Sequence, residues 1–178
     1  MREQLKLSVT EKDVENIYRS EFRRLLPTSK ITSPYNIDGL LEHKNVRSLL
    51  EFKFDVDLKS KRIQANIFTQ IIYYLKRFEQ NGQLLPSTLF VGDNNECFAL
   101  ETKQVAKFLN RNIDWELAPS TAHKNNPELI QALVDDINIA PMVFDVDESF
   151  RLRDIIKTLK DLSEGRVIKV TINKENIV

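Results

Sequence analysis

Cysteine is almost absent from this chain, which carries a single residue of that type among 178. Cys97 has no partner for an internal disulfide, so the fold depends on its core, as is usual for cytosolic proteins. His43 and His123 are the only histidines, and their spacing is not that of a metal pair, which argues against a structural zinc site. Long hydrophobic runs are also lacking. We therefore expect no signal peptide, no membrane span and a cytoplasmic location.

An excess of charge of one sign is absent as well, because 26 lysines and arginines balance 26 aspartates and glutamates. A protein that coats nucleic acid is usually basic, so this balance argues against that class. It is compatible with a nuclease, in which carboxylates that hold metal offset lysines that contact phosphate. No glycine-rich phosphate loop occurs, which argues against a nucleotide-driven motor. No nucleophile elbow occurs either. The same balance predicts that any binding of nucleic acid is weak and without sequence preference.

The periodicity of the apolar residues predicts an α/β fold. Helices are expected where these residues recur with a helical period, namely over residues 10–26, 62–80, 102–110, 126–136 and 148–163. Strands are expected at shorter apolar runs bounded by turn residues, namely residues 37–43, 47–56, 87–92, 96–101, 142–146 and 166–172. Thr10 and Asp13 form a candidate capping box at the first helix. The first two strands form a hairpin in a central mixed sheet that packs against the first two helices.

Four tripeptides in the chain have the form acidic residue, any residue, lysine, and their context separates them. Only Glu51-Phe52-Lys53 lies inside a strongly apolar strand, where a charge needs a partner or a purpose. Alternation along the strand places Glu51 and Lys53 on one face together with Asp55 and Asp57. A solvated strand face is the alternative interpretation.

Asp38 lies on the other arm of the predicted hairpin, so pairing of the arms would bring its carboxylate close to that of Glu51. Two neighbouring carboxylates repel each other unless a cation joins them. Magnesium takes a few oxygen ligands and keeps water for the rest. Lys53, on the same face, could then position an attacking hydroxide or neutralise charge on a phosphate. The alternative is that Asp38-Gly39 is only a turn.

These elements resemble the PD-(D/E)XK nuclease superfamily. The motif residues are Ile37-Asp38, Glu51-Phe52-Lys53 and, on the following helix, Gln70-Ile71-Ile72-Tyr73-Tyr74, which is similar to the Gln-x-x-x-Tyr element of RecB-like members. The chain departs from the pattern at Ile37, where the superfamily motif has proline. The resemblance implies that Asp38, Glu51 and the backbone carbonyl of Phe52 bind magnesium, with manganese as an alternative ion.

The same resemblance assigns the neighbouring side chains. Lys53 would align the attacking water, and Gln70 and Tyr74, which share a helix face, would lie beside the metal and help to hold the substrate. The alternative is that Tyr74 belongs to the core and Gln70 to the surface.

The first helix adds a second resemblance. Glu15-Asn16-Ile17-Tyr18-Arg19 looks like the Glu-x-x-Tyr-Arg opening of nuclease domains at the N-termini of large restriction–modification proteins. In that comparison Glu15 matches the helix glutamate that borders the metal site. A solvated glutamate is the alternative, and Glu11 and Glu21 on the same helix compete for the role. The resemblance implies a nuclease-like core over residues 1–110 and a C-terminal extension or joining region over residues 111–178.

The function that this resemblance implies is magnesium-dependent hydrolysis of DNA, as the endonuclease part of a restriction or other DNA-defence system. Methyltransferase and target-recognition domains or subunits would then be partners, and no membrane would be involved. Two alternatives stay open. One is a catalytically silent nuclease-like fold that binds DNA or a protein. The other is an unrelated α/β interaction module, in which Glu51 and Lys53 form surface salt bridges remote from Asp38 and Gln70.

Overall fold

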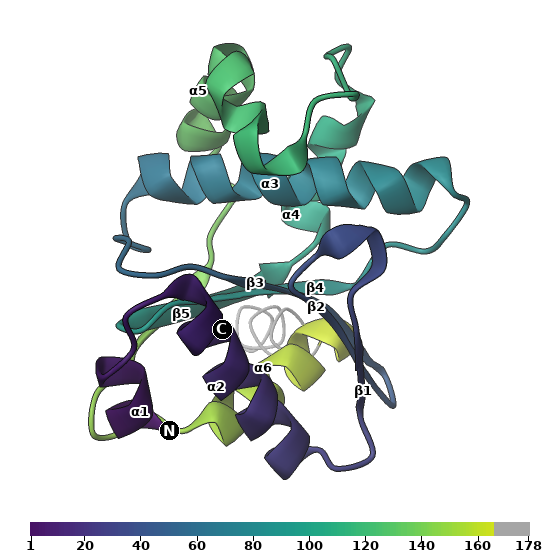
Figure 1. Ribbon diagram of the computed structural model, residues 1–178. Coiled ribbons are helices and arrows are strands. Elements are labelled where there is room, and N and C mark those ends of the chain that lie inside the picture. The colour runs from purple at the N-terminus through teal and green to yellow at the C-terminus, as the bar shows by residue number, and fades with distance from the viewer. Residues whose placement is uncertain (166–178) are drawn as a thin grey trace, which may run out of the picture.

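The computed structural model describes residues 1–165, which form a six-stranded mixed sheet with helices on both faces (Figure 1). The strands lie in sequence order: β1 (Lys30–Thr32), β2 (Gly39–His43), β3 (Val46–Phe52), β4 (Thr88–Gly92), β5 (Glu96–Glu101) and β6 (Met142–Asp145). Only β3 and β4 run parallel, and the other neighbours are antiparallel. The predicted α/β fold with a mixed sheet flanked by helices is confirmed. The predicted strand over residues 166–172 lies outside the described residues.

The helices are α1 (Arg2–Lys6), α2 (Glu11–Leu25), α3 (Lys61–Gln80), α4 (Lys103–Ala106), α5 (Pro127–Asp135) and α6 (Leu152–Glu164). Short 3-10 helices add η1 (Pro34–Asn36), η2 (Lys107–Asn110) and η3 (Pro119–Asn125), so the helix expected over residues 102–110 is divided between α4 and η2. Among the described residues, no helix combines the length and apolar character needed to cross a membrane.

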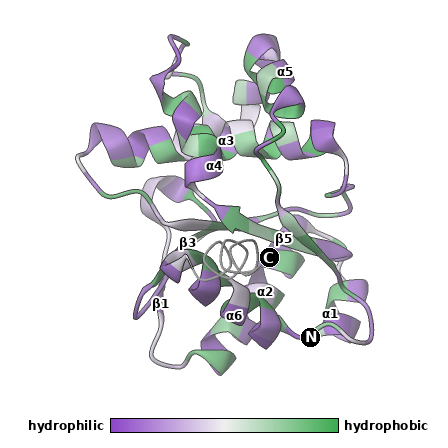
Figure 2. Ribbon diagram, turned by 180° about the vertical axis from the view of Figure 1, so that it is seen from behind, coloured by the Kyte–Doolittle hydropathy of each residue, from purple (hydrophilic) through white to green (hydrophobic). Residues whose placement is uncertain are grey.

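The sheet separates two hydrophobic cores. One lies between the sheet and the layer of α3, η2 and α5, and the other between the sheet and the layer of α2 and α6 (Figure 1). Hydrophobic residues are concentrated in the central strands between these layers (Figure 2). Leu49 of β3 contributes to the first core and Leu50 to the second, because successive strand residues point to opposite faces. Glu51 therefore points to the α3 side of the sheet.

Helix α2 begins with the predicted capping box. The Thr10 hydroxyl accepts the backbone N–H of Asp13, and the Asp13 carboxylate accepts the backbone N–H of Thr10. One face of the helix is fully buried through Val14, Tyr18 and Phe22. These side chains fix how α2 lies against the sheet, and they thereby position the polar residues on its other side.

Strand β3 ends at Phe52, so the prediction of a strand to residue 56 is wrong. The backbone of Asp55 takes a positive φ of 52°. The next backbone donors bond to side chains instead of a strand: Val56 N–H donates to the Asp93 carboxylate and Leu58 N–H to that of Glu96. The polar alternation from Lys53 to Asp57 is therefore not a strand face, and Lys53 lies just beyond the strand end.

Residues 111–165 share the sheet and both cores with the residues before them. Strand β6 pairs with β5, and α6 packs against β3, β4 and β5. On the other face, η3 and α5 pack against α3. Residues of the C-terminal segment therefore lie close to those of the helix that carries Gln70.

Candidate metal centre

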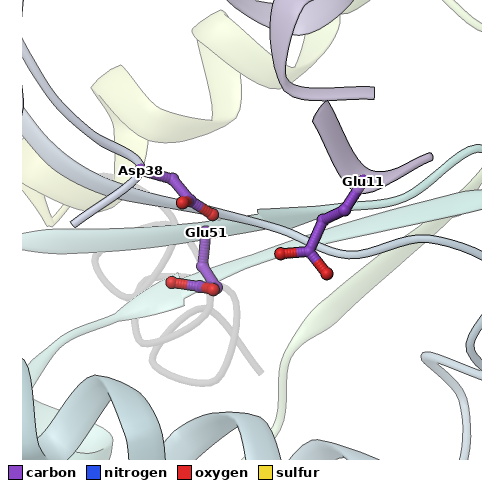
Figure 3. A group of neighbouring side chains, drawn as sticks. All are labelled: Glu11, Asp38 and Glu51. Carbon is purple, nitrogen blue, oxygen red and sulfur yellow. The ribbon is translucent and has the colours of Figure 1, made fainter. Parts of the chain in front are cut away.

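Three carboxylates meet at one end of the β2–β3 hairpin (Figure 3). Glu11 comes from the first turn of α2, Asp38 precedes β2 and Glu51 lies in β3. One carboxylate oxygen from each lies within 4.8 Å of the others. The hairpin register explains the approach of the last two, because Gly39 pairs with Leu50 and the preceding residue, Asp38, therefore comes next to Glu51.

Asp38 is held in place from two sides. Its Oδ2 accepts the backbone N–H of Phe52 at 2.8 Å, across the end of the hairpin. Its backbone carbonyl accepts a hydrogen bond from the Arg19 guanidinium of α2. Arg19 thus links the helix to the loop that carries the metal-binding candidate, a role that the sequence pattern did not reveal.

Glu51 is the most buried member of the cluster, with 1% of its surface exposed. Its Oε1 lies 3.3 Å from Lys53 Nζ. Its Oε2 has no hydrogen-bond partner among residues 1–165. A buried carboxylate oxygen without a partner is costly, because it has lost water and gained nothing in return. A cation shared with Asp38 and Glu11 would remove this cost.

The carboxylates favour protonation where no cation is bound. Burial, and then the charge of Asp38, raises the pKa of Glu51 well above its ordinary value, and Lys53 opposes this only partly. Burial is also the main cause that raises the pKa of Asp38 and of Glu11. Hard oxygen ligands with crowded negative charge suit magnesium or manganese, and the set of donors fits such an ion.

Lys53, Gln70 and Tyr74 lie next to this cluster as a connected chain. Lys53 Nζ donates to Gln70 Oε1 at 2.8 Å, and Gln70 Nε2 donates to the Tyr74 hydroxyl at 3.3 Å. The charges of Glu51, Asp38 and Glu11 all contribute to raising the pKa of Tyr74, although its burial contributes most. The structure therefore brings together Asp38, Glu51, Lys53 and Gln70.

The helix glutamate in the cluster is Glu11, whereas the motif resemblance selected Glu15. Glu15 lies one turn further along α2, and its carboxylate forms an ion pair with Lys12. It is near enough to contribute to the raised pKa of Asp38, after burial, but its carboxylate is not part of the group that could hold an ion. Both glutamates are on the same helix, so only the packing of α2 on the sheet distinguishes them.

Phe52 enters the site through its backbone. Its ring is fully buried in the core on the α2 side of the sheet and stacks on Tyr18, with ring centroids 5.5 Å apart. Its amide N–H is the donor to Asp38. Coordination of an ion by its carbonyl stays a prediction.

The raised pKa of Glu51 gives a prediction for the metal-free protein. The folded chain binds this proton more tightly than the unfolded chain, because the folded pKa lies above the ordinary value of 4.5. The stability that this proton contributes is complete below about pH 4.5 and is lost as the pH rises through the folded pKa. Glu51→Gln stays neutral, so its free energy of unfolding in EDTA should exceed that of the wild type by an amount that grows with pH.

Urea unfolding of both proteins over the range from about pH 5 to about pH 8 measures this difference. Added magnesium should stabilise the wild type more at the upper end of the range, since the ion competes with the proton. A difference that does not change with pH would show that Glu51 is already ionised in the metal-free fold.

No protein-family model matches this chain, and neither a curated protein nor a solved structure matches it.

Proposed function

We propose that this protein hydrolyses phosphodiester bonds in DNA with the help of a magnesium ion, as the nuclease part of a DNA-defence system. The observation that carries the proposal is the convergence of the carboxylates of Glu11, Asp38 and Glu51, the last of which has a buried oxygen without a hydrogen-bond partner among the described residues. Lys53 lies at the edge of the same cluster. The choice of DNA as substrate comes from the motif resemblance, and manganese is an alternative ion.

Each side chain of the site has a separate task in this proposal. Asp38, Glu51 and Glu11 would hold the ion, which supplies positive charge that makes bound water more acidic and offsets charge on the phosphate. The Lys53 ammonium lies 3.3 Å from the Glu51 carboxylate and can donate to a phosphate oxygen or to the attacking water. Gln70 holds that ammonium in place through its Oε1.

The alternative of an unrelated interaction module expects Glu51 and Lys53 to form a surface pair remote from Asp38 and Gln70. The pair is instead largely buried, with exposed side-chain fractions of 2% for Glu51 and 19% for Lys53. It contacts Gln70 directly and lies beside Asp38. The buried charge of Glu51 therefore lies against two further carboxylates. This arrangement supports a cation-binding site, and it is not that of a salt bridge which stabilises the surface.

The two helix glutamates give a matched test of the proposal. Glu11→Gln should lower the rate of magnesium-dependent DNA cleavage by about tenfold or more, because one of three ion ligands loses its charge. Glu15→Gln should change the rate by less than about threefold, because its carboxylate is paired with Lys12 and lies outside the cluster. Gel assays on linear and circular DNA, with and without EDTA, measure both rates.

If Glu15→Gln lost activity and Glu11→Gln kept it, Glu15, as the motif resemblance implies, would be the helix glutamate of the metal site. A wild-type chain that binds magnesium without cleaving any DNA would favour the silent nuclease-like fold.

A further inference from the structure

A cavity of about 190 Å³ adjoins the metal centre on the side of Lys53 and Gln70. These two side chains form part of its wall. The remaining lining residues come from the loop after β3, from the first half of α3 and from η3: Val56, Ile63, Asn66, Ile67, Ser120 and His123. One wall of the cavity therefore comes from η3, which packs on α3.

The lining combines two kinds of surface. Val56, Ile63 and Ile67 are aliphatic, whereas Asn66, Ser120 and His123 carry an amide, a hydroxyl and an imidazole. Each of these polar groups can both donate and accept hydrogen bonds. A planar group with apolar faces and a polar edge fits this lining, because its faces can contact the aliphatic side chains and its edge can bond to the polar groups. The volume is smaller than the roughly 300 Å³ or more of a typical pocket for a drug-sized ligand, so it admits one small group.

His123 supplies the aromatic ring of this lining. It is half-buried, and burial is the main cause that lowers its pKa, followed by the charges of Lys124 and of Lys53. The neutral imidazole that this favours is well suited to stacking against a flat ring and to hydrogen bonding at its edge. His123 and Lys53 line the same cavity, which places the ring on the side of the proposed reaction centre.

We propose that this cavity binds one unpaired nucleobase of the substrate strand, next to the phosphate that lies at Lys53 and the carboxylates. The inference rests on the proposed function, and it narrows the substrate to single-stranded DNA or to DNA with an unpaired base at the cut. A base inside a duplex is stacked on both faces and paired at its edge, so it enters such a cavity only after it leaves the stack. The polar groups accept several edge patterns, so discrimination among bases is weak.

Equilibrium binding tests the cavity apart from catalysis. The full chain is titrated, with calcium in place of magnesium, against three fluorescent probes of equal length: an oligodeoxythymidine strand, a deoxyribose-phosphate strand without bases, and a blunt duplex. Calcium binds oxygen ligands as magnesium does, with less strict geometry. The strand with bases should bind about tenfold more tightly than either of the others, which is the scale of one stacked base.

His123→Ala and Ser120→Phe should each remove this preference, the first by taking away the ring and the second by filling the cavity from an exposed position. The matched control is His43→Ala, since His43 lies in the hairpin and is not part of the lining. Equal binding of the strands with and without bases, or an unchanged preference in both cavity variants, would overturn the proposal. Cleavage in magnesium is measured separately, so a lack of cleavage contradicts the proposed function and leaves the binding result to decide on the cavity.

Discussion

Replacing Glu51 with glutamine is expected to lower the rate of DNA cleavage by about a hundredfold to a thousandfold and to stabilise the metal-free chain at neutral pH. The rate falls because the most buried ligand loses the charge that attracts the ion. The stability rises because an amide is less costly to bury than an unpaired carboxylate. Single-turnover cleavage and thermal unfolding in EDTA measure the two effects.

Glu101→Gln is a suitable control, since Glu101 is also followed two residues later by a lysine, Lys103, with which it pairs at 3.0 Å. It lies at the end of β5, away from the carboxylate cluster. Its substitution should leave cleavage within about twofold of the wild type, because Glu101 takes no part in the carboxylate cluster. If Glu51→Gln kept its activity, the metal centre as described would have to be abandoned.

Lys53→Ala should reduce cleavage by about a hundredfold to a thousandfold, the effect typical of losing one donor that stabilises charge in the transition state. Binding of magnesium should be unchanged or tighter, since Asp38 and Glu51 remain and a neighbouring positive charge is gone. The rise in melting temperature on addition of magnesium reports the binding.

Reduced cleavage together with unchanged magnesium binding distinguishes a lysine that takes part in the reaction from one that only supports the fold. A merely structural Lys53 would lower stability and metal binding together and leave the cleavage rate at saturating magnesium unchanged. Lys103→Ala serves as the control, because its partner Glu101 is remote from the cluster.

The hairpin part of the site could be predicted from the sequence because Asp38 and Glu51 lie close together in the chain. Alternation of polar and apolar residues identified Glu51 as a charge in a buried strand, and a short connection to the preceding strand brought Asp38 beside it. Lys53 belongs to the same motif as Glu51. Gln70 was selected by the motif resemblance, and it lies beside Lys53 because the helix after β3 packs back on the face to which Glu51 points.

The sequence alone could not show whether Glu11 or Glu15 joins the carboxylate cluster, because this depends on tertiary packing. The two residues lie one helical turn apart and share a face. Which of them reaches Asp38 depends on how far α2 is displaced along its axis, and that is fixed by the contacts of Tyr18. Its hydroxyl donates to the Asp93 carbonyl at 3.0 Å, and its ring lies so close to Gly92 that a Cβ there would approach it to 2.9 Å.

The end of β3 was misplaced for a related reason. The residues after Phe52 continue the polar alternation of a strand, but Asp93, Asn94 and Glu96 offer side-chain acceptors to the backbone of that segment. These acceptors come from the turn between β4 and β5 and from the first residue of β5, some forty residues later in the chain. A pattern confined to one segment contains no information about such partners.

The parallel pairing of β3 with β4 has a consequence for the order of events during folding. The two strands are separated in sequence by the whole of α3, so their contact closes a long loop and raises the contact order. Gln70 lies within that crossover connection and Glu51 lies just before it, and Glu11 joins them only when α2 has docked on the opposite face of the sheet. A chain in which α2 or α3 has not docked on the sheet therefore lacks the complete ion-binding centre, so magnesium binding reports whether both helix layers are in place.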